Sequence, residues 1–125
     1  MAATIITTIG KSKTLRARAG IITLPRIIGM AFGDGAVRND TVIVPSADDN
    51  ILKHELIRKP VDGVEIIHDT RVRYICTLGK DELAYQAINE CGLYDADGDL
   101  VCIKSFPNQC KDDDMEMQFR IDDLY

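Results

Sequence analysis

The sequence contains no tryptophan, and aromatic residues make up only 6% of its 125 residues. Sites that stack bases or sugars depend on such side chains, so a stacking site has little to draw on here. Glycine occurs 9 times and proline 4 times, which excludes collagen-like and proline-rich architectures. The hydrophobic share of 46% is typical of one globular domain that buries its own core.

Basic residues are also fewer than acidic residues. The chain has 15 Lys and Arg residues against 20 Asp and Glu residues, a formal net charge of −5, which argues against a nucleic-acid partner. The charge is uneven, because residues 1–60 contain nine basic and five acidic residues whereas residues 61–125 contain six and fifteen. Such an asymmetry steers a partner or a neighbouring subunit, or it reflects two solvated faces.

Targeting and membrane-spanning segments are missing as well. The start has no basic region followed by an apolar run of signal-peptide length, and the longest apolar stretches, such as 27–32, are far too short to span a bilayer. We therefore expect no membrane partner, and a protein that stays in the cytoplasm or is released by lysis.

No Cys-x-x-Cys pair occurs among Cys76, Cys91, Cys102 and Cys110, so we expect reduced, packed thiols rather than a zinc site.

Alternation of apolar and polar residues predicts a mainly β domain. The clearest example is 115–121, where every second side chain is apolar. The other expected strands are 1–9, 21–32 with an interruption at Pro25, 41–44, 64–70, 71–78, 84–94 and 100–106. The predicted fold is a mainly β (α+β) single domain over 1–125, an antiparallel sheet or sandwich with one or two short helices.

Two segments are candidates for the helices. Residues 11–19 are rich in Leu, Ala, Arg and Lys and precede a glycine, which predicts a short basic helix after a strand that Gly10 ends. A serine or aspartate cap within 46–49 would start a second helix that runs to Ile57. An extended conformation of 52–59 is the alternative.

No catalytic constellation is apparent in the sequence. His54 and His68 lie fourteen residues apart and are interpreted as structural or exposed rather than as an acid–base or metal pair. Gly33-Asp34-Gly35 predicts a tight turn and lacks the third glycine of a dinucleotide-binding fingerprint. We therefore predict no enzyme activity, no cofactor, and no catalytic, cofactor-binding or metal residues.

Two acidic clusters resemble metal sites at first sight. Residues 95–99 (Asp-Ala-Asp-Gly-Asp) begin like an EF-hand loop, but the glycine is fourth rather than sixth and the twelfth position lacks a glutamate. Asp97-Gly98 between apolar runs instead predicts a two-residue hairpin turn of type I′. Residues 112–114 are interpreted as a solvated loop, and Met115 and Met117 as core side chains rather than metal ligands.

The order of the motifs points to a family. Thr8-Ile9-Gly10-Lys11 opens the helical segment, an apolar strand runs into 30–35 (Met-Ala-Phe-Gly-Asp-Gly), and 90–100 reads Glu-Cys-Gly-Leu-Tyr-Asp-Ala-Asp-Gly-Asp-Leu. Over residues 7–103 this series resembles the N-terminal domain of bacteriophage tail-collar and tail-fibre proteins. That family has a Gly-Lys before a helix, a strand that ends in Gly-Asp-Gly, and a glutamate-containing hairpin of this type.

The resemblance implies a structural component of a phage tail or phage-tail-like particle, from an infectious phage, a prophage or a bacteriocin. It implies a virion protein, assembled in the bacterial host cytoplasm, whose partners are other tail, baseplate or fibre proteins. Further copies of the chain are expected as partners too, with a trimer as one form. Because family members usually head a longer fibre and this sequence ends at Tyr125, we expect a separate fibre chain or a stand-alone attachment or adaptor protein.

Two further hypotheses follow. The basic and acidic halves of the chain would meet between neighbouring subunits, in which case higher salt weakens the assembly, and edge strands would extend a partner's sheet. A small ligand- or carbohydrate-binding β module is the alternative function.

Overall fold

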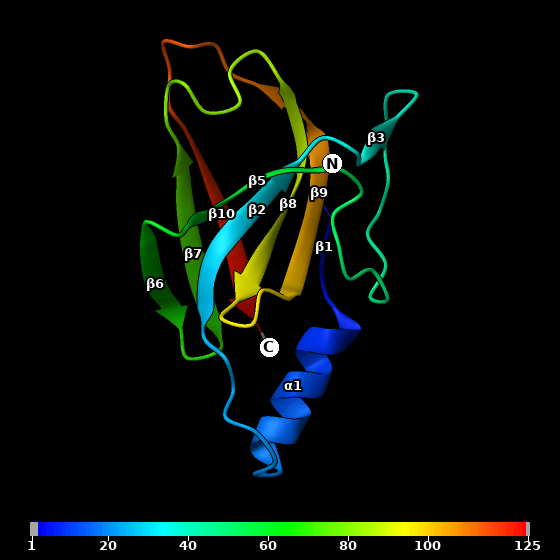
Figure 1. The fold of residues 1–125 in the computed structure, drawn as a ribbon, viewed down its shortest axis with the longest axis vertical. Helices are drawn as coiled ribbons and strands as arrows, with labels where there is room; N and C mark the ends of the chain where they lie inside the picture. The colour runs from blue at the N-terminus through cyan, green and yellow to red at the C-terminus, as the bar shows by residue number, and fades with distance from the viewer. Residues whose placement is uncertain (1–2, 125) are drawn as a thin grey trace.

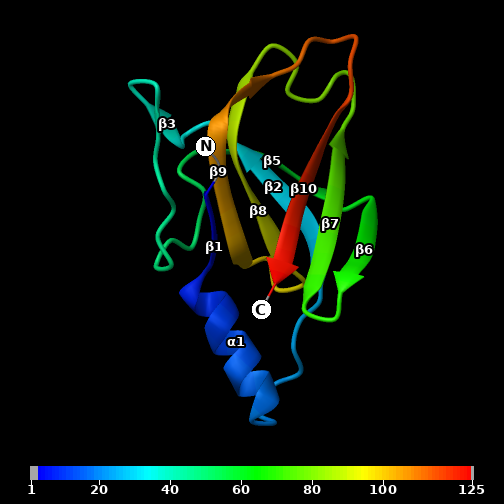
Figure 2. The same ribbon diagram turned by 180° about the vertical axis from the view of Figure 1, so that it is seen from behind.

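The computed structural model describes residues 3–124 and has two antiparallel sheets packed face to face, with one helix at the end of the sandwich (Figures 1 and 2). The larger sheet has the order β1-β9-β8-β2-β5: β1 (Ala3–Ile6), β9 (Leu100–Cys110), β8 (Ala87–Asp95), β2 (Ile27–Gly33) and β5 (Glu55–Pro60). The smaller sheet has the order β10-β7-β6: β10 (Met117–Leu124), β7 (Arg71–Leu78) and β6 (Gly63–His68). The predicted mainly β, antiparallel, sandwich-like fold is confirmed.

The main core lies between the two sheets. Phe119 of β10 packs edge-on against Phe32 of β2, with ring centroids 5.0 Å apart, and Phe106 of β9 lies 5.9 Å from Phe119. Alternate residues of a strand point to the same face of the sheet, and the set that points into the sandwich is apolar. Its other buried members are Met30, Cys76, Leu78, Ile88, Cys91, Leu93, Cys102 and Ile121.

A second, smaller core covers the outer face of the larger sheet. Ala31, Leu100 and Ile103 point away from the sandwich interior and pack with Leu52. Leu52 belongs to the long segment between β2 and β5, which also forms a small hairpin of β3 (Val37–Arg38) and β4 (Thr41–Val42). This segment therefore acts as a cover over the sheet face.

The helix α1 (Thr8–Arg18) begins inside the segment expected to be a strand. The Thr7 hydroxyl caps it by accepting a hydrogen bond from the Gly10 amide at 3.1 Å and donates to the Leu100 carbonyl at 2.8 Å. Gly10 does not end a strand, as expected from the sequence. It lies within the helix, at a point where a Cβ would sit only 2.8 Å from the Val101 carbonyl oxygen. Only glycine lets the helix and the sheet approach so closely there.

The second helix predicted from 46 to Ile57 is wrong, and the extended alternative is confirmed. β5 pairs antiparallel with β2, with Phe32 opposite Ile57 and Gly29 opposite Pro60. Sheet pairing along this edge decides the conformation, which local helix propensity does not anticipate. No helix among residues 3–124 is long and apolar enough to cross a membrane.

The predicted hairpin between β8 and β9 is present, but its turn is not the two-residue type I′. The loop is four residues long, 96–99, and in it only Gly98 has a positive φ, +87°. The type I′ signature, positive φ at two consecutive residues, is found instead at Asn39 and Asp40, between β3 and β4.

Several strand boundaries also differ from expectation. The first strand covers 3–6, and residues 1 and 2 of the expected strand lie outside the described part of the chain. Strand pairing of β2 begins only at Ile27, after the interruption at Pro25. Met117 packs against the core, but Met115 precedes β10 and is 41% exposed, so its assignment to the core is wrong.

Candidate functional site

The Gly-Asp-Gly turn is held by one buried carboxylate on β8. Glu90 is 1% exposed, and its Oε2 accepts the amides of Gly35 at 2.8 Å and His54 at 2.9 Å. Its Oε1 accepts the amide of Lys53 at 2.8 Å. A Cβ on Gly33 would lie 2.4 Å from the His54 carbonyl oxygen, so glycine is required there. Glu90 thus ties two loops to the sheet.

Asn89, next to Glu90 and also buried, completes this connection. Its Oδ1 accepts the Ala36 amide at 2.8 Å, and its Nδ2 donates to the Asp34 carbonyl at 3.1 Å. The same Nδ2 lies 3.0 Å from Asn108 Oδ1 on β9. Two adjacent side chains, Asn89 and Glu90, therefore fix the turn through its backbone.

The two histidines lie in different parts of the fold, because His54 lies in the loop just before β5 and His68 ends β6. His54 Nδ1 is 2.5 Å from Asp34 Oδ1 at the exposed rim of the Glu90 loops. His68 is exposed at the end of β6, in the smaller sheet. The expectation of structural or exposed histidines describes both positions.

The three carboxylates of the EF-hand-like segment 95–99 converge on a lysine. The Nζ of Lys13, on α1, lies 2.7 Å from Asp95, 3.1 Å from Asp97 and 2.7 Å from Asp99. Burial lowers the pKa of Lys13, but the hydrogen bonds to the three aspartates outweigh it and raise the pKa above its ordinary value. A lysine ammonium thus supplies the positive charge here, and it clamps α1 to the β8–β9 hairpin.

The cysteines follow the expectation in three of four positions. Cys76, Cys91 and Cys102 are buried and free, whereas Cys110 is free but exposed at the end of β9. Burial raises the pKa of the Cys76 and Cys102 thiols to about 12 and raises that of Cys91 as well. The buried thiols behave as small core side chains.

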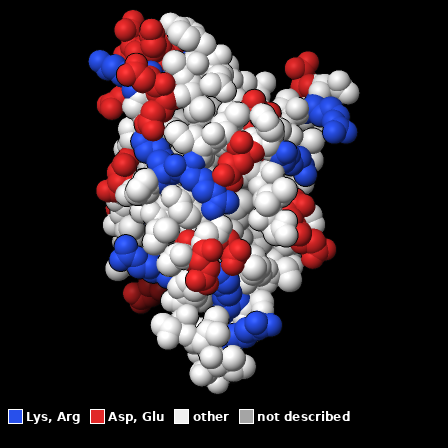
Figure 3. All heavy atoms as spheres, viewed as in Figure 1, with Lys and Arg blue, Asp and Glu red and all other residues white. Residues whose placement is uncertain are grey.

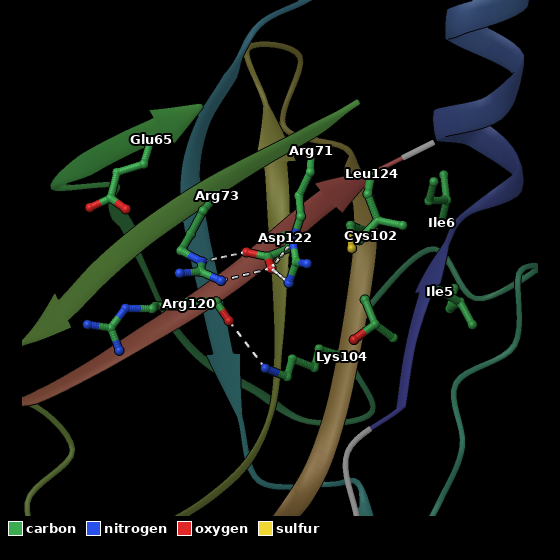
Figure 4. A pocket seen from close by; sticks show the side chains of 11 residues that line it. Ile5, Ile6, Glu65, Arg71, Arg73, Cys102, Lys104, Arg120, Asp122 and Leu124 are labelled. Atoms are coloured by element: carbon green, nitrogen blue, oxygen red, sulfur yellow. Dashed lines mark hydrogen bonds and ion pairs between the residues drawn. The ribbon is translucent and has the colours of Figure 1, made fainter. Parts of the chain in front are cut away.

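A groove of about 770 Å³ lies where the outer strands β1 and β10 of the two sheets face each other (Figure 4). We call it the seam; its charged lining residues are Glu65, Arg71, Arg73, Lys104, Arg120 and Asp122. Sequence reasoning missed it, although these are polar positions in predicted strands. Which strands lie side by side at a sandwich edge is set by topology, and the alternation pattern carries no such information.

Asp122 is the centre of charge pairing in the seam. Its carboxylate accepts hydrogen bonds from Arg73 Nε at 2.8 Å and Arg71 Nε at 2.7 Å. The hydrogen bond from Arg73, and then that from Arg71, lowers the pKa of Asp122 to about 2 against the opposing effect of burial. Lys104 Nζ reaches across from β9 to the Arg120 carbonyl at 3.2 Å.

A second surface feature is the projection formed by α1 and the loop after it. We call residues 8–24 the arm. It extends from the end of the sandwich (Figure 1), and its tip is largely uncharged in Figure 3. Its exposed apolar side chains are Leu15 at 60%, Ile21 at 70%, Ile22 at 37% and Leu24 at 51%.

The β sandwich, its capped helix and the two motif sites define a small, mainly β single-domain protein. Residues 1–121 match the family model of the phage tail-collar fibre protein N-terminal domain, so the chain belongs to that family. It is therefore a structural protein of the phage tail and a virion component that interacts with other tail components. No curated protein and no solved structure matches the chain significantly.

Proposed function

We propose that the chain is an attachment or adaptor protein between the tail baseplate and a fibre, and that the arm is its docking element. Its role is assembly rather than catalysis. The observation that carries this proposal is the exposure of four apolar side chains on one projection, where nothing in residues 3–124 covers them. Several large apolar side chains exposed on one projection of a small protein are typical of an interaction site.

The arm is suited to docking because its base is fixed. Thr7 caps the helix and hydrogen-bonds to the sheet, and Lys13 joins the helix to three aspartates of the hairpin. A pre-ordered element loses less conformational entropy when it binds. Full burial of one large aliphatic side chain contributes about 1.5–3 kcal/mol, so Leu15, Ile21 and Leu24 together provide a substantial anchor.

We further propose that the chain assembles with copies of itself, a trimer being one form, in the cytoplasm of the bacterial host before it becomes part of the virion. The uneven charge supports this, since residues 1–60 carry the basic excess and residues 61–125 the acidic excess. Contact between a basic surface of one copy and an acidic surface of another is favoured electrostatically.

Co-sedimentation tests the attachment role. The tagged chain is expressed in its source cells, particles are induced and pelleted, and the ratio of this chain to tail proteins is measured by mass spectrometry. We expect a fixed ratio for the natural chain. Ile21→Asp should leave the protein in the soluble fraction, because a buried charge at the interface is costly.

Val44→Asp is the matched control, because Val44 is 66% exposed but lies outside the arm. It should pellet like the natural chain. If the natural chain stayed soluble while tails pelleted, the attachment role would be wrong. If Ile21→Asp pelleted normally, the arm would not be the docking element. Saturable binding of a glycan without co-sedimentation would instead favour the ligand-binding alternative.

A further inference from the structure

We propose that the seam binds the acidic loop of a second copy of this chain, so that subunits join head to tail. The acidic loop comprises residues 112–116 (Asp-Asp-Asp-Met-Glu). The inference deepens the proposed self-assembly, and rests on it, by naming the two surfaces that meet.

The seam carries positive charge that its own residues leave unbalanced. Four cationic side chains line it against two carboxylates, in a chain whose net charge is −5. Asp122 pairs with both Arg71 and Arg73. The remaining two cations, Lys104 and Arg120, form no ion pair with any carboxylate among residues 3–124.

The contacts of those two cations confirm that their charge is available. Lys104 Nζ donates to a backbone carbonyl, that of Arg120, at 3.2 Å. The Arg120 guanidinium donates to the amide oxygen of Gln118 at 2.6 Å. Both acceptors are neutral, and Arg120 is exposed and lines the groove, so an incoming carboxylate finds charge and hydrogen-bond donors together.

The strands beside the seam also offer backbone groups. β1 is the last strand of the larger sheet and β10 the last strand of the smaller one. An outer strand has one edge of amides and carbonyls without a strand partner, which favours pairing with a segment from another chain. A loop that lies along the seam can therefore add main-chain hydrogen bonds to the charge pairing.

The acidic loop has complementary properties. It presents four carboxylates within five residues, all five of which are exposed. Its shape is fixed by hydrogen bonds from the Asp114 amide to Asp112 at 2.9 Å and from the Tyr85 hydroxyl to Asp113 at 2.9 Å. Within residues 3–124 no lysine, arginine or histidine forms an ion pair with this loop.

The loop of one chain cannot fill the seam of the same chain. Asp114 precedes Arg120, the unpaired seam cation nearest to it in the sequence, by six residues, most of them in the extended strand β10. At about 3.3 Å per residue the two lie roughly 20 Å apart, and Figure 2 shows the turn before β10 at the end of the sandwich opposite the arm. The occupant must come from another copy, and two different surfaces in contact build a ring or a filament.

The test uses two one-sided variants. The seam variant carries Lys104→Gln and Arg120→Gln, and the loop variant carries Asp114→Asn and Glu116→Gln, so that charge is removed without being reversed. Their masses are measured by light scattering after gel filtration in low salt, where charge pairing is least screened. The natural chain should form multiples of 13.9 kDa that shrink as salt is raised, and each variant alone should be monomeric.

Mixing the two variants gives the decisive result. The seam variant keeps an intact loop and the loop variant an intact seam, so an equimolar mixture should form a pair of twice the monomer mass and nothing larger. The control variant carries Arg38→Gln and Asp69→Asn, which remove charge in the same way at exposed positions outside both surfaces. It should assemble like the natural chain, and melting temperatures check that every variant is folded.

The inference is overturned if the natural chain is monomeric at about 100 μM, well above the micromolar range of weak interfaces. It is equally overturned if the one-sided variants assemble normally or if their mixture stays monomeric. A monomer that still co-sediments with tails leaves the attachment role intact, whereas a multimer that fails to co-sediment removes the attachment role and leaves this interface.

Discussion

Glu90 and Asp95 are both buried carboxylates on β8, each 1% exposed, but they are stabilised in different ways. Glu90 accepts hydrogen bonds from the backbone amides of Gly35, Lys53 and His54. Asp95 pairs with the Lys13 ammonium and also accepts the amides of Asp97 and Asp99 in its own turn. One site is built from main chain, and the other depends on a particular cationic side chain.

The difference determines what each site holds in place. Backbone amides come from any residue type, so Glu90 fixes the path of two loops while the loop sequence matters only where glycine is needed for space. Lys13 is a single side chain on α1, so the Asp95 site fixes the orientation of the helix and, with it, the arm. Removing Glu90 should therefore unfold more of the molecule than removing Lys13.

The largest effect is expected for Glu90→Ala. The substitution leaves three backbone amides without their acceptor in a poorly hydrated site, and an unsatisfied buried donor costs about 1–3 kcal/mol. We expect the free energy of unfolding to fall by about 4 kcal/mol, since such contributions are not fully additive, as measured by urea denaturation.

Glu90→Gln and Glu116→Ala sharpen this measurement. Glutamine retains one amide oxygen as an acceptor and should lose less stability than alanine. Glu116 is exposed in the acidic loop, so its loss should change the unfolding free energy by no more than about 0.5 kcal/mol. A loss below about 1 kcal/mol for Glu90→Ala would show that the loops do not depend on this carboxylate.

A smaller effect is expected for Lys13→Met, which keeps the length of the side chain but removes the charge. Asp95 would retain only its turn amides, and we expect a loss of about 2 kcal/mol. Because the folded pKa of Lys13 is raised above its ordinary value of 10.5, its contribution is complete below about pH 10 and is lost as the pH rises further.

The stability difference between the natural chain and Lys13→Met should therefore be constant from pH 6 to 9 and shrink above about pH 10.5. Thermal unfolding across this range measures it. A difference that stays the same into the alkaline range would contradict the assignment of the effect to the ammonium. Lys11→Met is the matched control on the same helix, because Lys11 is exposed.

The comparison also explains which parts of the fold were readable from the sequence. The strand β7 was predicted at its observed bounds, 71–78, because one face is apolar throughout. β5 is ambiguous in the sequence, because its conformation depends on pairing with β2 and on Glu90, which is far away in the sequence and binds the amides of Lys53 and His54 just before the strand. The place of Gly10 within the helix is not visible in the sequence, because glycine is needed there for the close approach to Val101, which is far away along the chain.

The sites follow the same rule. The motifs that identify the family are visible in the sequence, but the contacts that their residues make are not. Lys13 and Asp95 are separated by 82 residues, and no local pattern pairs them. The seam is a property of sheet order, since β1 and β10 are neighbours only because each is the last strand of its sheet. Local periodicity predicts strands, whereas partners across sheets require the fold.

The smallest effect is expected at the most exposed of the carboxylate sites, Asp122. Its folded pKa of about 2 lies below the ordinary 3.8, so its contribution is present above about pH 4 and is lost as the pH falls toward 2. Because Arg71 is partly exposed and screened by solvent, Asp122→Asn should cost no more than about 1 kcal/mol at pH 7. Melting temperatures at pH 7, 4 and 2.5 measure this.

The neighbouring Asp123 provides a control of opposite sign. Burial raises its pKa, so its ionised form is unfavourable in the folded chain, and Asp123→Asn should stabilise the protein at pH 7 but not at pH 2.5. If both substitutions shifted the melting temperature in the same direction at pH 7, the arginine pairing of Asp122 would not be what separates the two aspartates. Opposite shifts would extend the comparison of Glu90 and Asp95 to carboxylates nearer the surface. There, the groups that pair with a carboxylate decide whether it stabilises or destabilises the protein.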